Sequence, residues 1–250
     1  MTSADRIAEL TTRLAAVRTR LARAAEAAGR AVDSIDLLPV TKFFPASDVA
    51  ILWRLGCRDF GESRDQEAAA KVAAVAALLS GHADTGVRWH MIGRIQRNKA
   101  KSIALWADTV HSVDDGKIVA ALDRAAAQGL SDGRREGPLR VFVQLSLDGD
   151  TGRGGVDIAD RGAVDRMCAQ VAQAGALRLV GLMAIPPVGA DPDAAFEALA
   201  CEHRRVLENY PMANELSAGM TDDLEAAVRH GSTCVRVGTA LMGQRPLTSP

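Results

Sequence analysis

The sequence predicts an α/β protein, a (β/α)8 barrel of the TIM type with one extra helix at the N-terminus. Short apolar runs alternate with helical patterns eight times along the 250 residues, and strands separated by such helices form parallel βαβ units. About 250 residues is also the usual size of one such barrel. A doubly wound open sheet is the alternative, since the same alternation allows it. The two common nucleotide-binding fingerprints of open sheets are missing from the sequence, which favours the barrel.

The first expected element is an amphipathic helix over residues 4–29. Its apolar side chains recur at spacings of three or four residues, which places them on one helix face; they are Ile7, Leu10, Leu14, Val17 and Leu21. Gly29 is a suitable residue for ending this helix. The helix precedes the first strand of the predicted barrel and does not belong to the βα repeat.

Eight strands and seven further helices follow in alternation. The expected strands are Ile35–Thr41, Cys57–Phe60, Arg88–Ile92, Thr109–Ser112, Arg140–Leu147, Leu179–Ala184, Glu215–Ser217 and Thr233–Val237. The expected helices cover residues 46–55, 65–79, 96–106, 115–128, 159–174, 192–209 and 221–230. No linker divides the chain, so we expect one domain over residues 1–250, with the N-terminal helix in 1–31 and a flexible tail in 244–250.

Composition and charge exclude several classes of function. The formal net charge is −1, which is poorly suited to binding nucleic acid or an anionic membrane surface. No apolar run reaches the length of a membrane span. The four cysteines are scattered and the histidines are spread out, so we expect a reducing compartment and no metal site. The charged first ten residues do not resemble a signal peptide, and we expect a cytoplasmic monomer.

Lys42 is the first candidate for chemistry. It follows the apolar run of the first strand and precedes two aromatic residues, whereas Lys71 and Lys117 have the setting of ordinary surface lysines. Period-two alternation places Leu38, Val40 and Lys42 on one face of the strand. A partly desolvated amine at the barrel mouth can form a Schiff base with an aldehyde. The alternative is a strand-end lysine whose amine simply reaches solvent.

The last two strands offer a site for an anion. Arg236 alternates with Val235 and Val237, so it is expected to point into the barrel, where a charge needs a partner. Gly238 and Thr239 follow at once, and barrels often bind phosphate with the loops after strands seven and eight. Ser217 ends the preceding strand and adds a possible donor. A simple turn is the alternative for Gly238 and Thr239 taken alone.

Other polar residues stand at the ends of strands two and three. Glu62 and Ser63 follow the second strand, and His90 lies in the third. Each is a candidate for lining the mouth, although a helix cap or a satisfied core group is the alternative for each. An inward lysine, an inward arginine and phosphate donors together suit a phosphorylated aldehyde. The cofactor with these properties is pyridoxal 5′-phosphate (PLP).

At these residues the sequence resembles the pyridoxal-phosphate homeostasis protein family, single barrels similar to the N-terminal domain of alanine racemase (fold-type III PLP proteins). The resemblance covers nearly the whole chain. The matching segments are Pro39-Val40-Thr41-Lys42, Phe60-Gly61-Glu62-Ser63, Trp89-His90-Met91-Ile92-Gly93 with Gln96 and Asn98-Lys99, Gly181-Leu182-Met183-Ala184-Ile185-Pro186, Leu216-Ser217-x-Gly219-Met220-Thr221-Asp222-Asp223, and Gly231 to Ala240.

The resemblance implies the role of each candidate residue. It implies that Lys42 forms the Schiff base, that Arg236 faces the pyridine nitrogen, and that the phosphate is held by Ser217, Gly238 and Thr239. It adds Ser63, His90 and Met220 as further cofactor-binding residues. An always-charged arginine opposite the nitrogen would keep the ring unprotonated, which makes it a weaker electron sink.

The sequence departs from the family pattern at three positions. Ser63 stands where relatives usually have asparagine, Phe44 replaces a second basic residue two positions after the Schiff-base lysine, and Arg153 stands where lysine is common. The first departure weakens the expected contact of Ser63 with the cofactor. The second removes any relay of cofactor between lysines at that point.

Two functions remain open on the sequence alone. The first is a protein without catalytic residues that binds, buffers and delivers PLP, with PLP-dependent apoenzymes as partners. The second is a PLP-dependent amino-acid racemase or a related enzyme. Racemisation needs acid and base groups on both faces of the substrate. Tyr210, the one tyrosine of the chain, follows a predicted outer helix, and no residues are left for a second domain, so we expect the first function.

Overall fold

Eight parallel strands form a barrel in the computed structural model, which describes residues 3–82 and 84–244. The strands are β1 (Asp36–Pro39), β2 (Asp59–Glu62), β3 (Arg88–Met91), β4 (Thr109–Val113), β5 (Leu139–Ser146), β7 (Leu177–Ala184), β8 (Glu215–Ser217) and β9 (Cys234–Val237). Their order around the sheet is β1-β9-β8-β7-β5-β4-β3-β2, and a parallel bridge between Val40 and Gly61 joins β1 to β2. The expected barrel is therefore confirmed.

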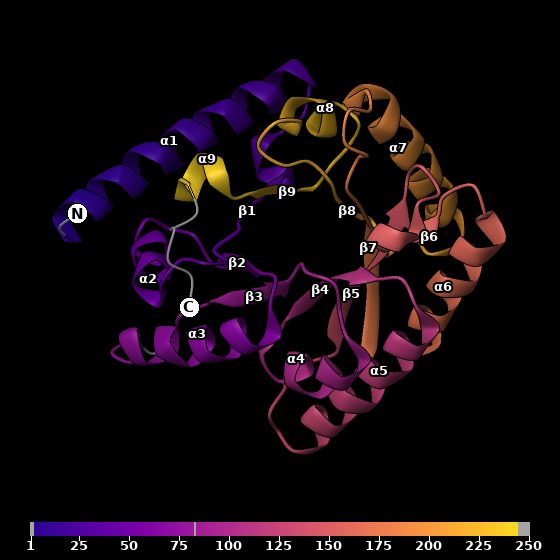
Figure 1. Cartoon of the computed structure of the whole chain (residues 1–250), viewed down its shortest axis with the longest axis horizontal. Helices are drawn as coiled ribbons and strands as arrows, with labels where there is room; N and C mark the ends of the chain where they lie inside the picture. Colours follow the sequence, from indigo (N-terminus) through magenta and orange to yellow (C-terminus); the bar gives the residue numbers. More distant parts are fainter. Residues whose placement is uncertain (1–2, 83, 245–250) are drawn as a thin grey trace.

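Helices surround the strands and follow them in the chain (Figure 1). They are α2 (Ala46–Arg54), α3 (Asp65–Leu78), α4 (Ala100–Trp106), α5 (Gly116–Ser131), α6 (Arg161–Gln173), α7 (Pro192–Asn209), α8 (Leu224–Arg229) and α9 (Thr239–Met242). Asp115, Asp160 and Asp191 cap α5, α6 and α7 by accepting backbone amides, as residues before a helix commonly do. Within the described residues no helix combines the length and the apolar character that crossing a bilayer requires.

The N-terminal helix α1 (Ser3–Ala27) completes the outer layer. The last barrel helix, α9, has four residues, and α1 packs against α2, α8 and α9 on that side of the barrel (Figure 1). Leu10, Leu14, Val17 and Leu21 are buried as their spacing predicts, whereas Ile7 is 42% exposed and lies outside the core. The extra helix thus covers a sector that a one-turn helix is too short to cover.

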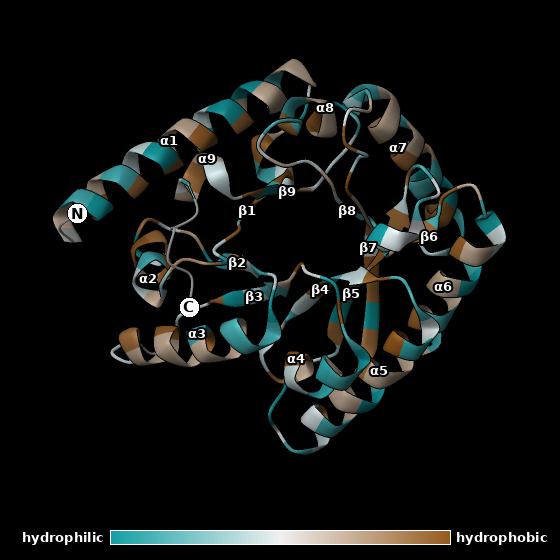
Figure 2. Ribbon diagram, viewed as in Figure 1, coloured by the Kyte–Doolittle hydropathy of each residue, from teal (hydrophilic) through white to brown (hydrophobic). Residues whose placement is uncertain are grey.

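The interior of the barrel is largely polar. Side chains that point outward from the strands, such as Phe60, Val110 and Val235, join the large core beneath the helices. Among the described residues, the separate inner cluster of apolar side chains is Phe142, Val180 and Met183. Hydrophilic colours accordingly extend onto β2 and β3 as well as the outer faces of the helices (Figure 2).

Some elements have boundaries that differ from the expected ones. The first strand ends at Pro39, since a turn begins at Thr41, whose carbonyl accepts the amide of Phe44. The helix expected over 96–106 divides into a 3-10 turn (η2, Arg97–Lys99) and α4.

The sequence patterns did not predict three short elements. The first is β6 (Val156–Asp157), a two-residue strand that pairs with β5; the others are the 3-10 turns η1 (Val32–Ser34) and η3 (Thr151–Arg153). Segments of two or three residues are too short to show a periodicity. Of the tail expected over 244–250, residues 245–250 lie outside the described residues.

Close packing of β7 on β8 generates a stability prediction. A Cβ atom at Gly181 would lie 1.7 Å from the carbonyl oxygen of Glu215, a clash with backbone that cannot be relieved by a side-chain rotation. Gly181→Ala should lower the free energy of unfolding by at least the roughly 1–3 kcal/mol of an overpacked core, measured by urea denaturation. Gly175→Ala, where a Cβ meets nothing within 4 Å, is the matched control. Equal stability of the two variants would contradict the packing described.

Candidate functional site

The carboxyl ends of β1, β8 and β9 bring three expected site residues to one end of the barrel. Lys42 follows β1, Gly238 follows β9, and Ser217 ends β8. These strands are neighbours in the order β1-β9-β8. A Cβ atom at Gly238 would lie 3.7 Å from the Cβ of Val40, so this glycine adjoins the strand that leads to Lys42. The C-terminal mouth is where barrels of this type carry their sites.

Lys42 occupies a tight turn just past β1. It is half-buried, and its Nζ lies 5.8 Å from the centroid of the Phe43 ring. Phe43 has a φ of 70°, a left-handed conformation that costs energy for a residue with a side chain. Over residues 3–82 and 84–244, Lys42 makes no hydrogen bond or ion pair with another side chain. Within these ranges no carboxylate neutralises its amine.

Lys71 supports this turn from α3. The sequence indicated a surface lysine, and this expectation is wrong: Lys71 is 7% exposed. Its Nζ donates to the carbonyl of Thr41 at 2.9 Å and to Glu62 Oε1 at 2.7 Å. Thr41 Oγ1 donates to the same carboxylate at 2.7 Å. Because α3 is rich in alanine around Lys71, its sequence shows no clear polar face that would reveal which side is buried.

The residue after Lys42 is held by the same group of side chains. The amide of Phe43 donates to Glu67 Oε1 at 2.6 Å, and this oxygen lies 3.3 Å from Lys71 Nζ. We call Glu62, Glu67 and Lys71 the turn clamp. It binds the backbone on both sides of Lys42, at Thr41 and at Phe43, and so accounts for the persistence of the strained turn.

Arg236 lies inside the barrel, as its alternation with Val235 and Val237 indicates. It is 4% exposed, and its Nη1 and Nη2 donate to Ser217 Oγ at 2.6 Å and to the carbonyl of Ala184 at 3.0 Å. Among the residues that the structure describes, no carboxylate forms an ion pair with it. Burial lowers the pKa of Arg236 from its ordinary value. A buried cation with only neutral acceptors is costly and invites an electron-rich ligand.

Ser217, a phosphate donor in the sequence analysis, has its hydroxyl inside the barrel. Its side chain is buried, and its Oγ lies 2.9 Å from His111 Nδ1 in addition to its bond from Arg236. A hydroxyl has one proton. If this proton is donated to His111, it is not available to a phosphate.

Gly238, Thr239 and Met220 are at the mouth. Gly238 precedes α9, and the first amides of a helix have no partner within the helix. Thr239 is exposed, which leaves its hydroxyl accessible. Met220 is 36% exposed, and its amide donates to Asp223 Oδ1 at 2.6 Å.

His90 and Ser63 do not join these residues. His90 lies deeper in the barrel, because it precedes the end of its strand; its Nε2 is 3.0 Å from Asp59 Oδ1 and its Nδ1 is 2.9 Å from His111 Nε2. Its contact with a cofactor stays a prediction. Ser63 is half-buried and lines a pocket of about 940 Å³ beside the Phe43 turn.

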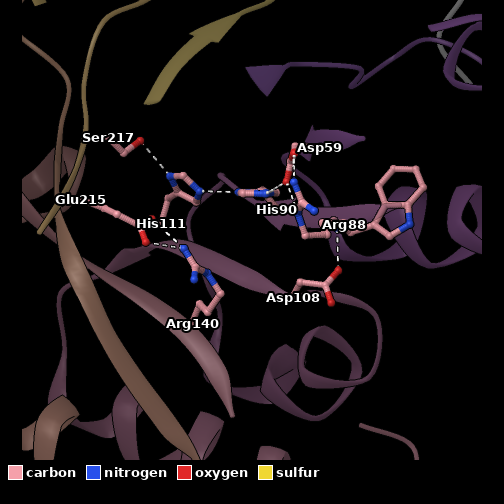
Figure 3. A network of polar contacts seen from close by, with 9 residues as sticks. Asp59, Arg88, His90, Asp108, His111, Arg140, Glu215 and Ser217 are labelled. Atoms are coloured by element: carbon pink, nitrogen blue, oxygen red, sulfur yellow. Dashed lines mark hydrogen bonds and ion pairs between the residues drawn. The ribbon is translucent and has the colours of Figure 1, made fainter. Parts of the chain in front are cut away.

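A chain of polar contacts links the two ends of the barrel interior, and sequence reasoning missed it. Figure 3 shows the chain running from Asp59 through His90 and His111 to Ser217. His111 is fully buried and stacks on Phe142, with ring centroids 4.5 Å apart. His111 lies in the fourth expected strand, and alternation along that strand could have predicted that its side chain points into the barrel.

Charges flank this chain. Arg88 donates to both oxygens of Asp59 at 2.7 and 2.6 Å. Burial would raise the pKa of Asp59, but hydrogen bonds from His90 and Arg88 outweigh it and lower the pKa to about 2. Burial lowers the pKa of His111 well below its ordinary value, and the nearby cations of Arg236 and Arg140 add to this effect.

The barrel, the mouth lysine and the interior arginine define a class of protein. The chain belongs to the family described as alanine racemase, N-terminal domain, whose model matches residues 12–246. Alanine racemase from Corynebacterium glutamicum has the same fold, with a TM-score of 0.64 at 14% identity. The match covers 98% of this chain and 63% of that one.

Within that class the chain belongs to the pyridoxal phosphate homeostasis proteins. It is 63% identical to the pyridoxal phosphate homeostasis protein of Mycobacterium tuberculosis, over 98% of this chain and 96% of the relative. The protein of the same name from Escherichia coli K12 is 36% identical, over 93% and 95% of the two chains. PipY of Synechococcus elongatus, solved with PLP bound, is 31% identical with a TM-score of 0.75, over 94% of this chain and 100% of that one. The resemblance inferred from the sequence is confirmed.

The low pKa of Asp59 predicts a pH-dependent contribution to stability. The pKa in the folded state lies below the ordinary 3.8, so the contribution is present above that pH and is lost as the pH falls toward 2. Asp59→Asn should therefore unfold more easily than wild type near pH 6, by about 2 kcal/mol. The difference should disappear toward pH 2, as measured by urea unfolding at several pH values.

Asp33→Asn, which changes an exposed aspartate of η1, should be nearly neutral throughout this range. A loss of stability in Asp59→Asn that is the same at pH 6 and pH 2 would contradict the pKa described.

Proposed function

We propose that the chain binds PLP and serves intracellular homeostasis of this cofactor by holding, buffering and delivering it. The observation that carries the proposal is the buried guanidinium of Arg236, whose acceptors in the part of the chain that the structure describes are all neutral. An aromatic nitrogen offers such a group a further acceptor in a site with little water. The names of the relatives from Mycobacterium tuberculosis and Escherichia coli, and the PLP bound to PipY, support the same conclusion.

The residues at the mouth fit the three functional groups of PLP. The Lys42 amine, which pairs with no carboxylate of the described residues, suits the aldehyde, with which a primary amine forms a covalent bond. The unused N–H groups of Arg236 suit the ring nitrogen. Gly238 and Thr239 suit the phosphate, because the amides that open α9 and the exposed hydroxyl are hydrogen-bond donors. Ser217 is better suited to orienting Arg236 than to binding phosphate, given its buried hydroxyl.

We propose further that the protein has no catalytic turnover of its own. Racemisation needs a second acid or base on the face of the substrate opposite Lys42. Tyr210 follows the last residue of α7, and helices of a βα barrel run antiparallel to the strands, so it lies at the end of the barrel away from Lys42. This chain matches only 63% of the alanine racemase of Corynebacterium glutamicum, so about a third of that enzyme has no counterpart in the match.

The compartment, oligomeric state and partners of the protein are also part of the proposal. We propose that it acts in the cytoplasm as a monomer and passes PLP to apoenzymes. Its cysteines Cys57, Cys168, Cys201 and Cys234 are all free thiols, as expected in a reducing compartment.

Covalent capture of PLP at Lys42 is the test of the proposal. The protein incubated with PLP and reduced with borohydride should gain the mass of one reduced adduct, located by peptide mass spectrometry on Lys42. Lys42→Ala should lose this adduct, because the nucleophile is gone. Lys117→Ala, which removes an exposed lysine, should retain it. Lys71 is unsuitable as a control because it holds the Thr41 carbonyl. An unmodified Lys42 would overturn the proposal.

Absence of racemisation is a separate prediction. Purified protein loaded with PLP should not interconvert D- and L-alanine above the rate of free PLP, because no group is expected opposite Lys42. Chiral chromatography of the reaction mixture measures this directly. Steady turnover that disappears in Lys42→Ala would show instead that the chain is an enzyme.

A further inference from the structure

The polar chain inside the barrel has two ends with fixed hydrogen-bonding roles. Arg236 can only donate, since a guanidinium has no acceptor. Asp59, which is ionised at neutral pH, can only accept. Between them lie Ser217, His111 and His90, each within 3.0 Å of the next partner. The two ends therefore favour one order of the protons along the chain.

Starting from Arg236, the contacts suit one order of protons. Arg236 donates to Ser217 Oγ, and the Ser217 hydroxyl, 2.9 Å from His111 Nδ1, is placed to donate its proton there. A histidine that accepts at Nδ1 carries its proton on Nε2 when neutral. His111 Nε2 then donates to His90 Nδ1.

Starting from Asp59 gives the same result. The carboxylate accepts from His90 Nε2, so a neutral His90 has no proton on Nδ1 and accepts there from His111. The reverse order would place an unprotonated His90 Nε2 against a carboxylate oxygen, two acceptors in contact. With His90 neutral, both histidines carry their proton on Nε2.

We propose that this chain is a positioning device for Arg236, and that His111 is a positioning residue of the ligand site although it touches no ligand. The inference rests on the proposed function, in which Arg236 faces the bound ring. Hydrogen bonds that all run in one direction polarise and strengthen one another. Ser217 is the link, because its hydroxyl accepts from Arg236 while donating to His111.

The surroundings hold His111 in the required place. Its ring stacks on Phe142 with an interplanar angle of 29°. The ion pair of Arg140 with Glu215, at 2.5 and 2.7 Å, lies beside it (Figure 3). Burial keeps the ring neutral, which the proton order requires. His111 can therefore serve as an acceptor for Ser217 with little freedom to rotate away.

The first measurement concerns the protein without PLP. Long-range ¹H–¹⁵N NMR spectra of imidazole nitrogens should show His111 and His90 with the proton on Nε2. A proton on Nδ1 of His111, or a doubly protonated His90 at neutral pH, would overturn the proposed order. Since no ligand is involved, this result stands whether or not Lys42 captures PLP, so the two proposals can fail separately.

The second measurement uses PLP titrations of variants. His111→Phe keeps the stacking on Phe142 but removes the acceptor of Ser217, and it should weaken PLP binding about tenfold and change the absorption spectrum of bound PLP. His111→Gln supplies both an acceptor and a donor, and it should restore affinity and spectrum to near wild type. His111→Phe with the affinity and spectrum of wild type would overturn the inference.

A buried histidine outside the barrel is the matched control. His203 on α7 is 8% exposed, and its Nε2 contacts the carbonyl of Ala213 at 2.8 Å. His203→Phe should lower the unfolding midpoint while PLP affinity and the spectrum remain those of wild type. If His203→Phe and His111→Phe alter PLP affinity and the spectrum equally, His111 acts through stability alone and the positioning role is excluded.

Discussion

A buried positive charge, with no carboxylate partner among residues 3–82 and 84–244, is the constraint on which the rest of this barrel depends. Arg236 uses two of its N–H groups inside a closed sheet, with Ser217 and the carbonyl of Ala184, and keeps others for a ligand. Those bonds require the end of β8 to lie close to β9, and they extend the polar contacts downward to the histidines. The apolar core is consequently on the outside of the strands, beneath the helices.

The sequence was sufficient for the barrel and for the residues that alternation governs. Arg236 could be assigned to the interior because a strand alternates its faces and the barrel assigns one face to the inside, and Lys42 could be assigned to the mouth because it follows the first strand. The contacts of His90 with Asp59 and His111 inside the barrel could not be read from its place in a strand. The contact between His90 and His111 depends on the register of β3 on β4, which no local pattern contains.

Lys71 shows why a helix can mislead. Its neighbours on α3 are mostly alanines, which fit either a buried or an exposed face, so composition gave no sign that the amine is buried. Its partners are Glu62 on β2 and the carbonyl of Thr41 after β1, both distant in sequence. A buried lysine is recognised from such partners rather than from its own helix.

The closure of the barrel between β1 and β2 has an evolutionary consequence. The backbone bridge there joins Val40 to Gly61, and the turn clamp lies beside it, next to Lys42. Selection for a closed sheet and selection for a well-placed amine therefore act on the same few positions. Replacing Lys71 alone would leave the buried carboxylate of Glu62 without its cation, and replacing Glu62 alone would leave the amine of Lys71 with the more distant Glu67. Substitutions at these positions are therefore expected to occur together, because the effect of one depends on the other. This epistasis follows from their place beside the pairing of β1 with β2.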